Sequence, residues 1–156
     1  MKLPWLVVVL GWASAGCTAR SFDVPEAVGR TSAGITHGAT DTGDDAVVAI
    51  VGAPGTTGCS GTVVAPHLVL TAGHCTVPLV VQGGRVVFGP SLAGATSSIP
   101  IARAVAHPRF DLATLTNDVG VLVLSSAAPA APVAMGSGAP ASGSTVRIVG
   151  WGLTGD

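Results

Sequence analysis

The sequence predicts an all-β protein built on an antiparallel barrel or sandwich. Its 156 residues include 22 glycines and 11 prolines, which interrupt the chain too often for a helical bundle. Apolar residues make up 48% of the chain and gather in short runs of Val, Ala and Leu. Glu and Lys occur once each, so the chain has too few of these residues to form long helices with charged faces. Many short strands separated by turn residues are typical of such barrels and sandwiches.

The N-terminal residues, MKLPWLVVVLGWASAGC, are typical of a secretory signal at residues 1–16. Lys2 precedes a short apolar run and a small-residue exit, and the run is shorter than the roughly 20 residues that span a bilayer. Two ways of processing this signal are compatible with the sequence. One is ordinary cleavage after Ala15; in the other, SAGC resembles a lipobox, and a lipidated Cys17 becomes the mature N-terminus and membrane anchor. We therefore expect an exported protein, either secreted or a periplasmic or cell-surface lipoprotein.

Residues 17–34 are polar and aperiodic, which predicts a tether or pro-segment. After Asp45 the pattern changes to short β-type runs separated by glycine and proline. Gly83 and Gly84 suit the positive φ angles of a two-residue hairpin loop between two of these runs. The predicted strands are residues 46–51, 61–65, 67–71, 79–82, 85–88, 99–105 and 119–124.

Residues 125–144 contain no charged side chain, and their Ala, Pro, Gly and Ser content predicts a linker. A further strand is predicted at 145–150, followed by GWGLTGD. A single strand cannot bury its apolar face alone, so we expect a second unit to begin at 145–156.

The charge pattern argues against a nucleic-acid partner. The formal net charge is -1, and the six arginines among the seven basic residues are scattered singly. This leaves no basic stripe to follow a phosphate backbone.

One short stretch, LTAGHC at residues 70–75, places His74 directly before Cys75. A metal site, a disulfide beside a catalytic base, and simple packing all fit this pair. A zinc site would combine Cys59, His67, His74 and Cys75, but these spacings lack the close Cys-x₂₋₄-Cys pair of structural zinc sites.

Three landmarks resemble the trypsin-like (chymotrypsin-fold) serine proteases, and they occur in that family's order. The first is CSG at 59–61 with TAGHC at 71–75, the second is HPRFDLATLTNDVGVLVL at 107–124, and the third is GWGLT at 150–154. The resemblance covers residues 35–156. It implies a chymotrypsin-like antiparallel barrel at 35–124 as the first of two, an interbarrel linker at 125–144, and a second barrel that stops after its first strand at 145–156.

The resemblance also implies the chemistry. His74 is the general base, and Asp118 orients its ring and stabilises the imidazolium. Cys59 and Cys75 form a disulfide, and His107 has a structural role. The implied activity is that of a serine endopeptidase acting on proteins or peptides, without cofactor or metal.

The nucleophile of this family lies in a GDSGGP segment, which the 156 residues do not contain. The oxyanion hole and specificity pocket belong to the same half of the family's fold, so we expect the 156-residue chain alone to be inactive. The alternative is a non-catalytic exported binding module derived from a protease barrel. Ile35 is the expected N-terminus after activation, although Gly34 precedes it and the nearest basic residue is Arg30.

Overall fold

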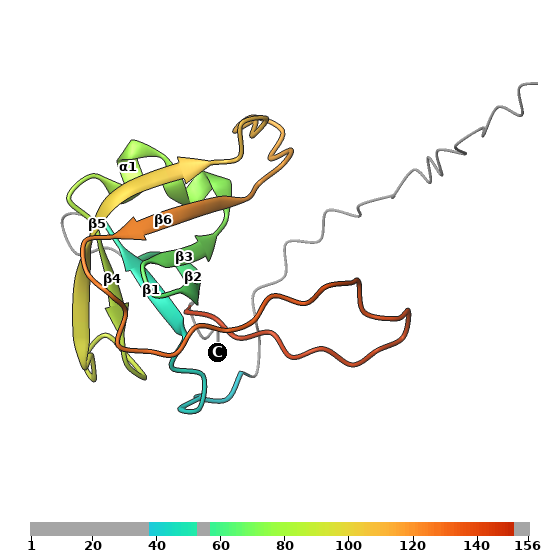
Figure 1. The fold of residues 1–156 in the computed structure, drawn as a ribbon, viewed down its shortest axis with the longest axis horizontal. Helices are drawn as coiled ribbons and strands as arrows, with labels where there is room; N and C mark the ends of the chain where they lie inside the picture. Colours follow the sequence, from blue (N-terminus) through green and yellow to red (C-terminus); the bar gives the residue numbers. More distant parts are fainter. Residues whose placement is uncertain (1–37, 53–56, 152–156) are drawn as a thin grey trace, which may run out of the picture. The chain divides into compact units, whose positions relative to one another are not determined.

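Six antiparallel strands close into a barrel in the order β1-β2-β3-β6-β5-β4 (Figure 1). The structure is a computed structural model that describes residues 38–52 and 57–151, all within one unit, Ala33–Asp156. The predicted barrel is thereby confirmed, whereas the predictions for residues 1–34 and for Ile35 lie outside the described residues. The strands are β1 (Val47–Val51), β2 (Thr57–Ala65), β3 (Leu68–Thr71), β4 (Arg85–Phe88), β5 (Ser97–Ala106) and β6 (Gly120–Leu124).

Alternating burial along the strands produces the barrel interior. In β6, Gly120, Leu122 and Leu124 are buried, while Val121 and Val123 between them are partly exposed. Side chains of a strand point to opposite faces in turn, so one set of aliphatic residues fills the barrel. The buried cluster consists of Ala46, Val48, Ile50, Cys59, Val63, Val69, Cys75, Val86, Phe88, Ile99, Leu122 and Leu124.

The pairing of β3 with β6 determines where the site lies. The two strands are antiparallel, and Thr71 at the end of β3 is the partner of Gly120 at the start of β6. His74 follows Thr71 by three residues, and Asp118 precedes Gly120 by two. The register of this pair therefore brings His74 and Asp118 to the same end of the barrel.

One predicted strand is wrong. Residues 79–82 belong mostly to a short helix, α1 (Pro78–Val81), so they do not form a hairpin with β4. The pairing partners of β4 are β1 and β5. A short apolar run does not by its period distinguish strand from helix, and Pro78 is well suited to the first helical turn. Gly83 has a φ of 67° and the Gly84 N–H donates to the Val81 carbonyl at 2.9 Å, so the two glycines end a helix.

The predicted strand at 145–150 is also not formed. These residues are described but belong to no helix or strand. The predicted linker before them likewise has no regular structure, but it is tied to the barrel where it begins. The Ala128 N–H donates to the Pro66 carbonyl at 2.7 Å, and the Val133 N–H donates to the Val63 carbonyl at 2.9 Å.

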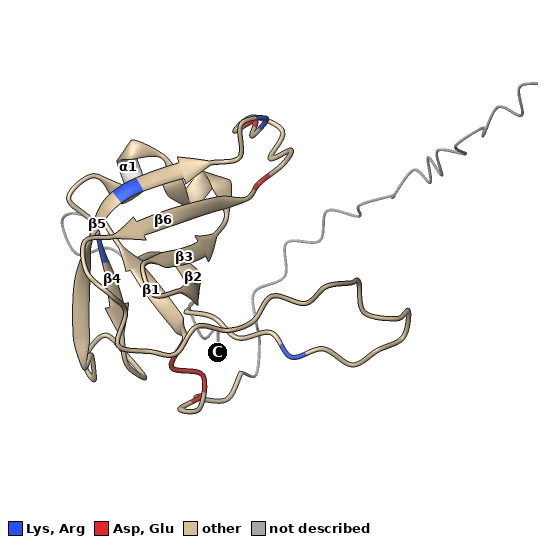
Figure 2. Ribbon diagram, viewed as in Figure 1, with Lys and Arg blue, Asp and Glu red and all other residues tan. Residues whose placement is uncertain are grey.

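Charged side chains are few on the part of the chain that the structure describes (Figure 2). Arg85 lies on β4 and Arg103 on β5, whereas Asp44 and Asp45 are neighbours just before β1, and Arg109 and Asp111 share the loop between β5 and β6. Among the same residues, no helix is long and apolar enough to cross a membrane.

Candidate active site

His74 lies in a short 3₁₀ helix, η1 (Gly73–Thr76), that directly follows β3. The turn is closed by the Cys75 N–H donating to the Ala72 carbonyl at 3.1 Å and by Thr76 Oγ1 donating to the Gly73 carbonyl at 2.7 Å. A disulfide joins Cys75 to Cys59 on β2, with the two Cα atoms 6.1 Å apart. This confirms the predicted disulfide, and it ties the residue next to His74 to the barrel wall.

Asp118 is positioned by the turn before it. Asn117 has a φ of 54°, a left-handed conformation that asparagine adopts more readily than most residues. Its side-chain amide donates to the Arg109 carbonyl at 2.9 Å across the loop. Val119 N–H donates to the Asn117 carbonyl at 2.7 Å, and the chain then enters β6. Asn117 therefore forms the turn, and Asp118 directly follows it.

His74 and Asp118 are joined at two points. The backbone N–H of His74 donates to Oδ1 of Asp118 at 2.8 Å, and ring Nδ1 lies 2.8 Å from Oδ2. The His74 side chain is 46% exposed and that of Asp118 24%. The carboxylate is thus partly covered while much of the imidazole surface remains open to solvent.

Burial raises the pKa of Asp118, but hydrogen bonds from the His74 backbone and ring, the charge of His74 and the Gly73 backbone together bring that pKa below its usual range. The carboxylate is therefore ionised at neutral pH and can only accept hydrogen bonds. Nδ1 of neutral His74 must then carry the proton, which leaves the lone pair on Nε2. Such an imidazole can take a proton from a hydroxyl placed at Nε2.

The zinc alternative does not fit this geometry. Potential ligand atoms of Cys59, His74 and Cys75 all lie within 4.8 Å of one another, but both sulfur atoms are used in the disulfide. Cysteine binds a metal as its thiolate, which a disulfide does not offer. His67, the fourth residue of that alternative, has its Nδ1 3.4 Å from the Leu124 carbonyl instead.

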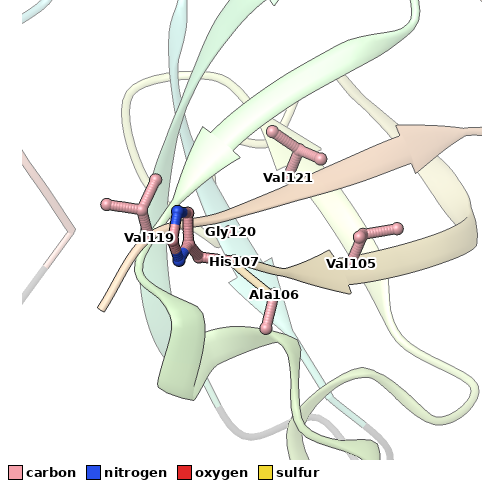
Figure 3. Close-up of a pocket in the computed structure, with 6 residues that line it drawn as sticks. All are labelled: Val105, Ala106, His107, Val119, Gly120 and Val121. Atoms are coloured by element: carbon pink, nitrogen blue, oxygen red, sulfur yellow. The ribbon is translucent and has the colours of Figure 1, made fainter. Parts of the chain in front are cut away.

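His107 closes the base of the loop that carries Asp118. Its backbone N–H donates to the Val119 carbonyl at 2.8 Å, and its Nδ1 accepts from the Arg109 N–H at 3.2 Å. These contacts are those of a structural residue. The ring also borders a shallow, almost wholly apolar pocket of about 180 Å³ (Figure 3). The pocket is lined by Val105, Ala106, His107, Val119, Gly120 and Val121.

Comparison with known proteins gives the family. The family model described as Trypsin matches residues 29–156. The chain belongs to the trypsin family of serine proteases. Its similarity to a trypsin of Saccharopolyspora erythraea is 34% identity over 117 residues, which covers 69% of this chain and 49% of that protein.

Two mammalian family members are similar to this chain at comparable identity. Serine protease 57 of Mus musculus is 32% identical over 111 residues, covering 63% of this chain and 38% of that protein. Human serine protease 1 is 31% identical over 104 residues, covering 62% and 40% respectively. The chain thus spans less than half the length of these trypsin-family relatives.

The structure adds two contacts that the motifs by themselves do not show. The backbone N–H of His74 is a second donor to Asp118, which no side-chain pattern records. A Cβ on Gly73 would lie 2.9 Å from the ring of Phe110 and 3.2 Å from Oδ1 of Asp118. The small residue before His74 therefore lets the loop that carries Asp118 approach closely.

Proposed function

We propose that this chain carries the general base and the orienting carboxylate of an exported, trypsin-like serine endopeptidase. His74 is the base, Asp118 orients it, and the nucleophilic serine is provided by a GDSGG-type segment that follows residue 156. The two-point contact between His74 and Asp118 is the observation that carries this proposal. The Cys59–Cys75 disulfide supports export, because such bonds persist in oxidising compartments.

In the proposed reaction, the serine hydroxyl attacks the carbonyl carbon of a peptide bond and its proton passes to Nε2 of His74. The imidazolium that forms is stabilised by Asp118 and then gives the proton to the leaving amine. Water completes the cycle by hydrolysing the acyl-enzyme, with His74 again as the base. Asp118 stays ionised throughout, and its low pKa supports that role.

The test compares the 156-residue chain with a longer version that includes the GDSGG-bearing half. Both are incubated with a fluorophosphonate probe for activated serines and with a peptide-substrate library. We expect the longer version alone to be labelled and to cleave peptides. His74→Ala should abolish labelling, and Asp118→Asn should lower kcat by about 10⁴-fold, as in other Ser-His-Asp enzymes. His67→Ala, which removes an imidazole elsewhere on the barrel, is the matched control.

Two results would contradict the proposal. Labelling of the 156-residue chain that disappears in His74→Ala would place the nucleophile inside this sequence. Absence of labelling in the folded longer version would favour the non-catalytic binding module.

A further inference from the structure

Ser60 on β2 binds both backbone polar groups of a residue 91 positions away. Its Oγ accepts a hydrogen bond from the Trp151 N–H at 2.6 Å and donates one to the Trp151 carbonyl at 3.1 Å. A serine hydroxyl has one donor and two acceptor sites, so both bonds form together. The Trp151 indole Nε1 also donates to the Val47 carbonyl on β1 at 3.2 Å. We name these contacts of Ser60, Val47 and Trp151 the Ser60 clasp.

Glycine at position 150 makes the Ser60 clasp sterically accessible. A Cβ on Gly150 would lie 3.1 Å from Ser60 Oγ, which is tighter than most such contacts, and 3.6 Å from Ser60 Cβ, an ordinary contact distance. A side chain at this position would therefore crowd the hydroxyl that binds Trp151. Glycine as the first residue of the GWG motif therefore leaves room for the Ser60 hydroxyl.

Ser60 is also connected to His74 by two short routes. The Ser60 carbonyl accepts a hydrogen bond from Thr71 Oγ1 at 2.8 Å, at the end of the strand that leads to His74. The preceding residue, Cys59, is bonded to Cys75, which follows His74. Through Ser60, Trp151 is therefore connected to the residues that hold His74, the proposed base, in place.

The rest of the segment before Trp151 is held less firmly. Arg147 pairs with Asp41 and Asp44, but its side chain is 66% exposed, and surface ion pairs constrain a chain weakly. Ile148 is 77% exposed, and residues 147–151 border an open groove of about 1240 Å³. The position of the chain at Trp151 therefore depends mainly on the Ser60 clasp.

We propose that Ser60 is a positioning residue for the reaction. Ser60 holds the Trp151 backbone against β2 and thereby sets the position, relative to His74, from which the chain after Trp151 continues. That position in turn determines how the nucleophilic serine of the later chain meets Nε2 of His74. This inference rests on the proposed function. Misplacing reacting groups by about 1 Å can lower a rate by about 10²-fold, so loss of one hydroxyl remote from the chemistry should be measurable in kcat.

The first experiment tests the clasp without requiring activity. In the full chain carrying Trp5→Phe and Trp12→Phe, Trp151 is the only tryptophan, and the sequence contains no tyrosine. Ser60→Ala should shift Trp151 emission to longer wavelength and increase its quenching by acrylamide. Ser60→Thr, which keeps a hydroxyl, should restore both values. Ser98→Ala removes a hydroxyl bonded to Arg85 and is the matched control. Unchanged emission in a folded Ser60→Ala variant would overturn the clasp.

The second experiment uses the longer version with the GDSGG-bearing half, with rates normalised to the fraction of folded protein. We expect Ser60→Ala to lower kcat by about 10²-fold, with KM and the pH dependence of kcat unchanged because the His74–Asp118 pair is intact. Ser60→Thr should recover most of the loss. An active wild type with an equally active Ser60→Ala variant would overturn the positioning role and leave the proposed function standing. A wild type that neither labels nor cleaves would overturn both.

Discussion

Asp118 accepts two hydrogen bonds from His74, one from the backbone N–H to Oδ1 and one from ring Nδ1 to Oδ2, each at 2.8 Å. The backbone contact fixes the carboxylate relative to η1, and the ring contact fixes the imidazole relative to the carboxylate. Both oxygens of Asp118 are therefore used by one residue, and the ring is left with only Nε2 free for chemistry.

The first prediction concerns the tautomer of His74. Neutral His74 should carry its proton on Nδ1, because an ionised carboxylate cannot donate to it. In Asp118→Asn the amide can donate to Nδ1, and the proton should then move to Nε2. Nitrogen chemical shifts of ¹⁵N-labelled imidazole report the protonated atom. The same tautomer in both proteins would argue against the interaction with Oδ2, and the signals of His67 provide an internal reference.

The second prediction concerns acid stability. Because the pKa of Asp118 is lowered in the folded state, this group stabilises the fold at pH values above its unfolded pKa of about 3.9. That contribution should be lost as the pH falls through the lower, folded pKa. Urea midpoints of wild type and Asp118→Asn should therefore differ most at neutral pH and converge below about pH 4. A difference that stays constant between pH 7 and pH 3 would contradict this linkage. Asp41 and Asp111, whose pKa values are also lowered, are present in both proteins and cancel in the comparison.

The third prediction concerns the Cys59–Cys75 disulfide. The bond closes a loop with a sequence separation of 16, for which chain entropy predicts about 3 kcal/mol of stabilisation. The double variant Cys59→Ser and Cys75→Ser should lose about that amount in urea unfolding monitored by circular dichroism. Cys17→Ser is the control and should leave the midpoint unchanged. Equal midpoints for wild type and the double variant would show that the loop is already constrained without the bond.

The fourth prediction concerns Gly61, the third residue of the CSG motif. A Cβ at this position would overlap Cγ1 of Val69 and lie 3.2 Å from the Leu70 carbonyl oxygen on the neighbouring strand. Gly61→Ala should therefore destabilise the barrel by about 1–3 kcal/mol through overpacking. The matched control is Gly138→Ala, since a Cβ there meets nothing within 4 Å. Thermal unfolding of the two variants measures the difference. A Gly61→Ala variant as stable as Gly138→Ala would mean that β2 and β3 can separate without cost.

The local sequence contained enough information for most of the barrel. Strands at β1, β2, β3, β4, β5 and β6 were predicted within a few residues, because valine-rich runs between glycines and prolines favour a half-buried extended chain. The run at 79–82 was misassigned because four apolar residues after a proline have no distinguishing period. The residues at 145–150 formed no strand because β pairing needs a partner, which the pattern of one segment does not provide.

The sequence by itself determined the class of fold, the order of the three landmarks and the candidate residues, since these depend on residue type and short-range spacing. The catalytic roles of His74 and Asp118 and the domain boundaries stay predictions. The family resemblance implied that Asp118 orients His74, and the tertiary structure shows the contact across 44 residues. Only the tertiary structure decided that Ser60 holds Trp151, 91 residues away. Contacts at such separations follow from strand register and barrel closure, which depend on the packing of all six strands together.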